Sequence, residues 1–256
     1  MPGMILGPFD GIFCLFESYS FITLWNLATR EYRVLPKCRA TLRQNTIVNS
    51  SNVGFGLDPI SNDFKLVLIL TLFDKKRSVL CDFSHVVVYN LSTNSWRNLE
   101  GFDMNYDFLL ETFDSTYLNG VCYWLTKQDF QFKVILSFDM SNEVFQEIQH
   151  PSSIPESADR TLGLHIDYLA VLVLDENYFE IWIMKEKRWT KHLSVGPFIE
   201  VEKPLAFWKK GSFLVESSTG DLLLYDPITR EMRNLGLQNC WFAVLYKENL
   251  LTIKGG

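Results

Sequence analysis

The 256-residue sequence has few of the features by which membrane proteins and many enzymes are recognised. No stretch shows the 3.6-residue periodicity of a long helix. The longest apolar runs, such as residues 66–73, are far too short to span a bilayer. The N-terminus lacks a basic segment followed by an apolar one, so no signal peptide is predicted. No GxSxG, HExxH, P-loop or complete GxGxxG motif is present, and nothing therefore points to an enzyme.

Cysteine and histidine are scarce and scattered. No CxxC pair exists, and no Cys/His group has the spacing of a zinc site, so we expect neither a metal nor another cofactor. The four histidines share no short spacing and are interpreted as surface or core residues. Reduced thiols in the cytoplasm or the nucleus fit best with this usage. The five cysteines are Cys14, Cys38, Cys81, Cys122 and Cys240.

Positive charge is in the minority, with a formal net charge of −6. A general nucleic-acid binder is therefore not expected, because neutralising phosphates requires a basic face. The charge suits a basic protein partner, although many proteins carry such a charge without one. By contrast, the aromatic fraction of 14% is high, and aromatic residues favour pleated, half-buried surfaces.

One short pattern occurs five times. An aromatic residue closes an apolar strand, a polar turn follows, and a second large apolar residue comes seven positions later, as in the segment from Trp25 to Tyr32. Self-similarity at a period of about 40–50 residues is typical of propellers and solenoids. Because each copy predicts strand–turn–strand, a propeller is favoured. The other copies begin at Tyr89, Phe138, Trp182 and Tyr225.

The strand pattern predicts five four-stranded sheets in residues 4–35, 53–99, 116–148, 162–193 and 205–235. Two further strands are predicted at 241–246 and 250–253. The predicted fold class is therefore all-β, a kelch-like β-propeller of five four-stranded blades plus an incomplete sixth, with residues 1–256 forming one domain. We expect strands from ahead of Met1 to complete the sixth blade in an intact protein.

The connections predict a binding face. In a four-stranded meander, the second connection and the link to the next sheet emerge on the same face, and the long connections are predicted there, at 37–51, 74–84, 101–114, 151–160 and 194–204. Recognition residues tend to lie on such loops, so this face is predicted to bind a protein. The acidic majority among its charges would steer a basic ligand, although a merely solvated rim is an alternative. The candidate residues are Asp74, Lys75, Lys76, Arg77, Asp103, Asp107, Glu111, Glu156, Asp159, Glu200 and Glu202.

Four segments carry a family resemblance. Residues 54–67, GFGLDPISNDFKLV, resemble the GFGxDPxxxDYKVV signature of plant F-box-associated domains. Residues 24–32 are similar to the NPATRxYRxLP hairpin of that family, 179–185 to its IWxMKEYG strand, and 204–209 to its PLxxWKNG opening. The resemblance covers essentially the whole chain and is greatest to the S-locus F-box proteins and their relatives.

The resemblance implies a kelch-like propeller that is the non-catalytic substrate receptor of a Skp–cullin–F-box (SCF) ubiquitin ligase. In such proteins the F-box binds the Skp-type adaptor and the propeller binds the protein to be ubiquitinated, which in the S-locus branch is a basic S-ribonuclease in self-incompatibility. No F-box precedes the first sheet here, so adaptor and cullin are expected as partners only if one lies upstream. A kelch-like propeller enzyme, a lectin, and a truncated relative without ligase function remain alternatives.

Overall fold

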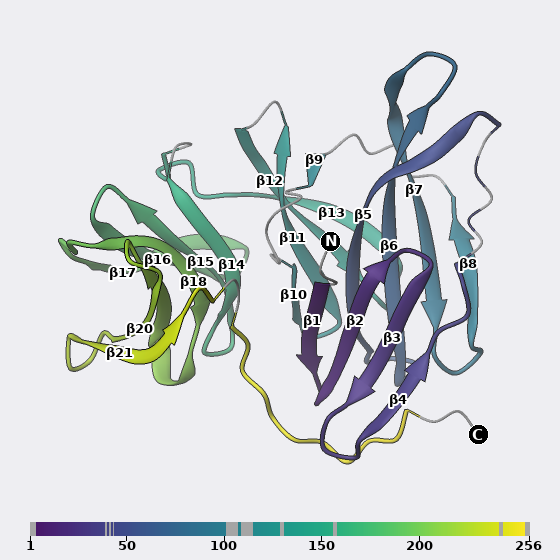
Figure 1. Ribbon diagram of the computed structural model, residues 1–256. Coiled ribbons are helices and arrows are strands. Elements are labelled where there is room, and N and C mark those ends of the chain that lie inside the picture. Colours follow the sequence, from purple (N-terminus) through teal and green to yellow (C-terminus); the bar gives the residue numbers. More distant parts are fainter. Residues whose placement is uncertain are drawn as a thin grey trace. The chain divides into compact units, whose positions relative to one another are not determined.

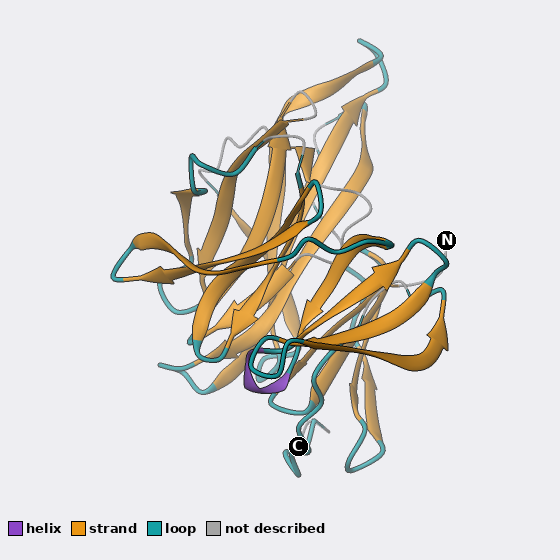
Figure 2. Cartoon of the chain, turned by 90° about the vertical axis from the view of Figure 1, so that its left-hand side faces the viewer, coloured by secondary structure: helices purple, strands orange, loops and turns teal. Residues whose placement is uncertain are grey.

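The computed structural model describes residues 4–38, 40, 42, 44–100, 107–108, 115–128, 131–155, 158–240 and 243–253. Apart from a three-residue 3-10 helix, Lys209–Gly211, every regular element in these ranges is a β-strand (Figures 1 and 2). No helix in the described ranges is long and apolar enough to cross a membrane. The all-β prediction is confirmed.

The strands form five antiparallel sheets, and each contains a meander of four strands consecutive in the sequence, which we call blades 1 to 5. Blade 1 consists of β1 (Met4–Phe9), β2 (Ile12–Ser18), β3 (Phe21–Asn26) and β4 (Glu31–Val34). Blade 2 consists of β5 (Thr46–Asp58), β6 (Asp63–Asp74), β7 (Val79–Asn90) and β8 (Ser95–Leu99). Blade 3 consists of β10 (Ser115–Leu118), β11 (Val121–Gln128), β12 (Gln131–Asp139) and β13 (Val144–Gln149).

Blade 4 consists of β14 (Asp159–His165), β15 (Tyr168–Asp175), β16 (Tyr178–Lys185) and β17 (Arg188–Val195). Blade 5 consists of β18 (Val201–Phe207), β19 (Phe213–Ser217), β20 (Asp221–Asp226) and β21 (Glu231–Gln238). Five four-stranded blades are thus confirmed. A short strand that was not predicted, β9 (Asp107–Phe108), pairs with β11 and extends the sheet of blade 3.

The chain divides into two compact units. Unit 1 comprises residues 1–129, 136–146 and 246–256 and contains blades 1 and 2 and most of blade 3. Unit 2 comprises residues 130–135 and 147–245 and contains blades 4 and 5.

The core of unit 1 lies on both faces of β6. Leu66, Leu68 and Leu70 belong to the cluster shared with blade 1, whereas Val67 and Ile69 belong to the cluster shared with blade 3. Successive side chains of a strand point to opposite faces. A strand between two other blades is therefore apolar throughout, which explains why the sequence shows little alternation here.

Two glycines of β5 allow blade 3 to approach closely. A Cβ atom built on Gly54 would lie 2.4 Å from the Trp124 ring, and one on Gly56 would lie 2.2 Å from the Tyr117 ring. Neither distance is possible for a real side chain, so the GFG segment is needed where aromatic rings of the next blade pack on the backbone.

The core of unit 2 is largely aromatic. Phe179 of blade 4 contacts Phe213 of blade 5, with ring centroids 5.0 Å apart, and Tyr225 lies 5.1 Å from Phe213. These rings join the two blades into one core, since aromatic pairs at such separations bury large areas and prefer tilted or edge-on contacts.

The repeated hairpin joins the third and fourth strands of a blade. Trp25 lies opposite Tyr32, and Tyr225 lies opposite Met232, as the pattern predicts. In blade 4 the turn has only two residues, so Trp189 lies opposite Met184 instead of opposite Trp182. The fourth copy therefore pairs differently from the first and the fifth.

The prediction of an incomplete sixth blade is wrong. Residues 243–253 form no strand, and residues 246–253, which belong to unit 1, pass along the hairpin of β3 and β4. The Asn26 amide donates to the carbonyl oxygens of Asn249 (3.0 Å) and Leu251 (2.7 Å). Glu31 accepts from the backbone N–H of Ile253, whose side chain is buried in the core shared by blades 1 and 2. Side chains of blade 1, not a neighbouring strand, satisfy this backbone.

Candidate protein-binding surfaces

Two of the long connections predicted for the binding face are short. Strand β6 continues to Asp74 and β7 starts at Val79, so only residues 75–78 form a turn where a loop from 74 to 84 was predicted. Between β17 and β18 only residues 196–200 lie outside strands. The strands extend further because residues such as Val79 and Leu80 pair across the hairpin with Asp74 and Phe73.

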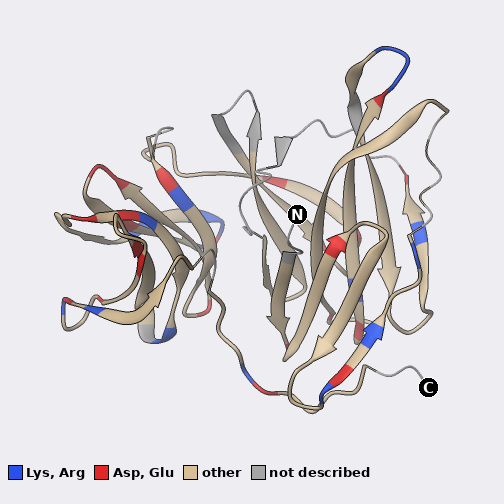
Figure 3. Ribbon diagram, in the orientation of Figure 1, with Lys and Arg blue, Asp and Glu red and all other residues tan. Residues whose placement is uncertain are grey.

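The turn at the end of β6 forms a fixed cationic tip in unit 1 (Figures 1 and 3). The Asp74 carboxylate accepts from the backbone N–H groups of Lys76 (2.8 Å) and Arg77 (3.1 Å). These hydrogen bonds, that from Arg77 first, hold the pKa of Asp74 below its ordinary value. The Lys75, Lys76 and Arg77 side chains are exposed, whereas Asp74 is half-buried and shapes the turn.

The link between blades 4 and 5 forms a second surface, in unit 2. The Phe198 ring is half-buried against Phe179 and Tyr225, with centroids 5.4 Å and 5.0 Å away. The next residue, Ile199, is 85% exposed. An aromatic anchor therefore holds a large apolar side chain outward, into solvent.

Backbone hydrogen bonds hold this link on both sides. Phe198 N–H donates to the carbonyl oxygen of Asn177 in the β15–β16 turn (2.8 Å). Ser218 N–H, in the β19–β20 turn, donates to the carbonyl oxygen of Glu200 (2.9 Å). The link thus lies between the second connections of two adjacent blades, on the face where the meander rule places it.

Acidic side chains are exposed on the elements next to this link. Glu200 and Glu202 are exposed at the start of β18, and Asp159 is exposed at the start of β14, a strand that contacts β18. Glu176 is exposed in the β15–β16 turn, next to Asn177. We call Asp159, Glu176, Ile199, Glu200 and Glu202 the link surface. It presents one apolar side chain among negative charges, which is suited to a basic protein.

The remaining predicted candidates are not placed in detail. Asp103, Glu111 and Glu156 lie outside the described residues. Asp107 lies in β9, where only the backbone is described. Three predicted acids thus lie on two contacting strands of unit 2, Asp159 on β14 and Glu200 and Glu202 at the start of β18, and the predicted cations lie on the tip in unit 1.

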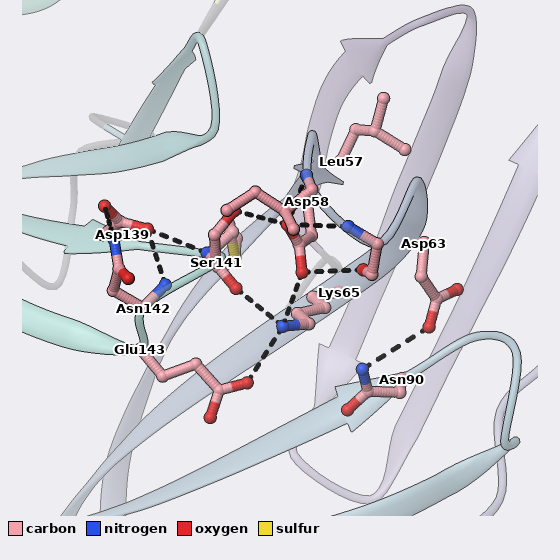
Figure 4. Close-up of polar contacts among 12 residues, drawn as sticks. Leu57, Asp58, Asp63, Lys65, Asn90, Asp139, Ser141, Asn142 and Glu143 are labelled. Carbon is pink, nitrogen blue, oxygen red and sulfur yellow. Dashed lines mark hydrogen bonds and ion pairs between the residues drawn. The ribbon is translucent and has the colours of Figure 1, made fainter.

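A buried ionic cluster joins blades 2 and 3 inside unit 1 (Figure 4). Lys65 Nζ lies 2.9 Å from Asp58 Oδ2 and 3.0 Å from Glu143 Oε1, and it donates to the carbonyl oxygen of Met140 at 2.7 Å. The Lys65 and Asp58 side chains are 7% and 4% exposed. Arg97 donates to the same Glu143 oxygen.

The charges of this cluster compensate one another and stabilise the packing of blades 2 and 3. Burial alone would raise the pKa of Asp58, but hydrogen bonds from Ser141, Lys65 and Ser61 outweigh it and hold the pKa well below the ordinary range. Burial likewise opposes the charge on Lys65, yet its two carboxylate partners raise its pKa. Every charge is compensated, so the cluster offers no free acid or base.

This cluster was not predicted from the sequence. Asp58 also shapes the turn after β5, because it accepts from the backbone N–H of Ile60 at 2.9 Å. The available signal was a lysine inside an apolar segment, since Lys65 lies between Phe64 and Leu66, both buried. Lysine is almost never fully buried unless paired.

Two tryptophans of outer strands donate hydrogen bonds to backbone carbonyls outside their own blade. Trp96 Nε1 donates to the carbonyl oxygen of Pro36 (2.6 Å), just after blade 1, and Trp189 Nε1 donates to that of Gln149 (2.7 Å), at the end of blade 3. In both cases the outer strand of a blade is tied to the end of the preceding blade. These indoles support the scaffold and do not form a ligand cage.

Two histidines of unit 2 lie close together. His165 and His192 lie 5.0 Å apart between ring centroids, and burial, followed by the charge of His192, lowers the pKa of His165. Within the described ranges no three Asp, Glu, His or Cys side chains are grouped so that they could hold a metal ion.

Comparison with known proteins gives a family. A family model described as "F-box associated beta propeller domain" matches residues 2–239. A putative F-box protein of Arabidopsis thaliana is 28% identical over 232 residues, covering 87% of this chain and 55% of the relative. An F-box/kelch-repeat protein of the same plant is 24% identical, covering 87% of this chain and 60% of the relative.

The chain spans about half the length of these relatives. Among solved structures, an oligogalacturonate lyase in complex with manganese has a TM-score of 0.53, with 9% identity, 92% of this chain and 64% of that chain covered. A likeness at this identity concerns the fold alone.

Proposed function

Since this chain belongs to the family of F-box associated beta propeller domains, we propose that it is the target-binding module of an F-box protein. The observation that carries the proposal is the link surface of unit 2, where Ile199 is 85% exposed on a backbone held by two neighbouring turns. Side chains presented on a preformed surface lose little entropy on binding, and exposed apolar anchors supply much of the affinity of protein interfaces.

The target of the proposal is a basic protein. Asp159, Glu200 and Glu202 are exposed and acidic, and they would attract a basic surface while Ile199 enters an apolar depression on it. In finer detail, the module would act in an SCF ubiquitin ligase, in the cytoplasm or the nucleus, with an F-box upstream binding the Skp-type adaptor. A basic S-ribonuclease in self-incompatibility is the target that the S-locus resemblance suggests.

A pulldown tests the assignment to an F-box protein. This chain is compared as bait with the same chain extended at its N-terminus by an F-box. The extended protein is expected to capture both the Skp-type adaptor and a protein target, whereas the chain alone captures only the target. If neither bait retains a target, the proposal is wrong.

Matched variants test the link surface. E200K/E202K is expected to weaken binding of a purified S-ribonuclease about tenfold, because each exposed charge pair contributes up to about 1 kcal/mol and reversal adds repulsion. The control E186K/E231K makes the same change of charge in the β16–β17 turn of blade 4 and at the first residue of β21 in blade 5. I199S is compared with I228S, since Ile228 is also strongly exposed. Equal losses in variant and control would contradict the proposed surface.

A further inference from the structure

The cationic tip of unit 1 is a second surface, of opposite charge. Lys75, Lys76 and Arg77 are consecutive and exposed, in a chain whose net charge is −6. Among the residues that the structure describes, only Asp74 forms an ion pair with any of them, to Arg77 at 3.8 Å. Like charges at adjacent exposed positions repel each other, so an anion placed against the tip would relieve that repulsion.

The strands behind the tip carry an apolar row. Ile47 of β5 lies opposite Phe73 of β6, which lies opposite Leu80 of β7. Residues directly opposite in antiparallel strands have their side chains on the same face. Ile47 and Leu80 are 40% and 45% exposed. We call the ends of β5, β6 and β7 around the tip, residues 46–48 and 72–80, the arm. One face of the arm therefore offers a row of large apolar side chains next to three cations.

We propose that this arm binds an acidic peptide segment containing large apolar side chains, carried by a protein partner. The carboxylates of the segment would contact Lys75, Lys76 and Arg77, and its apolar side chains would cover Ile47, Phe73 and Leu80. The proposal does not depend on the target-binding function assigned to unit 2, because it concerns different residues and a partner of opposite charge.

The rigidity of the arm favours a specific complex. Asp74 fixes the turn through hydrogen bonds from two backbone N–H groups, and Lys75 N–H donates to the carbonyl oxygen of Asn45 at 3.0 Å, tying the turn to the start of β5. The backbone that carries the cations is therefore ordered before the partner arrives, which lowers the entropy lost on binding.

A protein segment fits better than a nucleic acid or a membrane. Binding to a polyphosphate backbone usually needs a basic face, and the overall charge of this chain would repel a long polyanion. Stable adsorption to an anionic membrane also needs more than three charges, since each contributes about 1 kcal/mol near the surface. The apolar row would face polar phosphates in a nucleic-acid complex but can be covered by leucine side chains of a peptide.

The test uses the whole chain and a labelled synthetic peptide in which glutamate pairs alternate with single leucines. Fluorescence anisotropy is expected to show saturable binding that weakens as the ionic strength rises above about 0.1 M, where screening acts within about 10 Å. K75E/K76E/R77E is expected to lose about tenfold in affinity or more. I47S/L80S is expected to lose about fivefold with little change in salt dependence.

The control K185E/K187E/R188E reverses three exposed cations in the β16–β17 hairpin of unit 2 and changes the net charge equally. It is expected to bind the peptide nearly as well as the unchanged chain. An equal loss in both triple variants would overturn the proposal, because net charge alone would then explain binding. K75Q/K76Q, a milder change, is measured if the triple variant does not fold, and an unchanged affinity there would count against the tip.

Competing ligands are measured in the same assay. A single-stranded RNA oligonucleotide and vesicles containing anionic lipid are each titrated against the unchanged chain. If either binds more tightly than the peptide, and K75E/K76E/R77E abolishes that binding, the partner class named here is wrong. A peptide with serine in place of leucine is expected to bind about fivefold more weakly, and equal binding would remove the role of the apolar row.

Discussion

Replacing Lys65 by methionine tests the view that a buried ionic cluster holds blades 2 and 3 together. Lys65→Met keeps a long unbranched side chain but removes the positive charge between Asp58 and Glu143. Removing one partner of a buried ion pair usually costs about 3–5 kcal/mol, because the other charge is left without compensation. We therefore expect a large loss in the free energy of unfolding.

The contacts that Asp58 and Glu143 keep after the substitution limit the loss in the free energy of unfolding. Glu143 keeps its contact with Arg97, and Asp58 keeps hydrogen bonds from Ser61 and from the backbone of Ile60, so neither carboxylate is left bare. The Met140 carbonyl loses the Lys65 ammonium, which costs about 1 kcal/mol or more. The expected loss is therefore near the lower end of the range, about 3 kcal/mol.

The effect should depend on pH in a defined direction. The pKa of Asp58 is depressed in the folded chain, so its stabilising contribution is present above its unfolded pKa of about 4 and is lost as the pH falls through the folded value. Below about pH 4 the unchanged protein loses this contribution too. The difference between the two proteins is then expected to shrink.

Urea unfolding followed by circular dichroism measures these free energies. The control is Lys191→Met, which removes the half-exposed partner of Glu180 and should cost less than about 1 kcal/mol. A double-mutant cycle with Asp58→Asn isolates the coupling between the two charges. The reasoning is refuted if Lys65→Met costs no more than the control, or if the cycle shows no coupling at neutral pH.

Two further predictions concern packing and thiol reactivity. Gly56→Ala should lower the free energy of unfolding by about 1–3 kcal/mol in the same urea assay, because the added Cβ would overlap the Tyr117 ring. A loss below about 0.5 kcal/mol would mean that the ring moves aside freely. Cys14 and Cys122 are buried, and desolvation raises the pKa of both thiols. A coloured thiol reagent at pH 8 should therefore label the half-exposed Cys240 first, and Cys14 and Cys122 only after unfolding. Rapid labelling of Cys14 in the folded chain would contradict the buried core.

The blades could be predicted because their signal is repeated. Each hairpin between third and fourth strands places an aromatic or large apolar residue at the end of one strand and another at the start of the next, as in the pair Tyr89 and Trp96. Blade 4 differs because Glu186 and Lys187, both with positive φ, close a two-residue turn. Sequence spacing alone does not separate a short turn with a longer strand from a longer turn with a shorter strand.

The position of the link between blades 4 and 5 could be predicted from the sequence, whereas its exposed side chains could not. The meander rule placed this link, predicted at 194–204, beside the second connections of the blades, and the hydrogen bonds from Phe198 to Asn177 and from Ser218 to Glu200 agree with that position. The exposure of Ile199 could not be foreseen, because it depends on Phe198 filling the aromatic core from the neighbouring position. Likewise Lys65 and Glu143 are far apart in the sequence and meet only through the packing of two blades.

The C-terminal segment shows why apolar content alone misled the strand prediction. Residues 250–253 contain two leucines and an isoleucine, which suggests a strand, yet only Ile253 is buried in the core. A strand needs a neighbour that satisfies its backbone groups along its length. Here Asn26, Glu31 and Arg33 supply those hydrogen bonds from side chains, so the segment stays extended without pairing. The apolar residues of this segment therefore indicate packing against blade 1, not a sixth sheet.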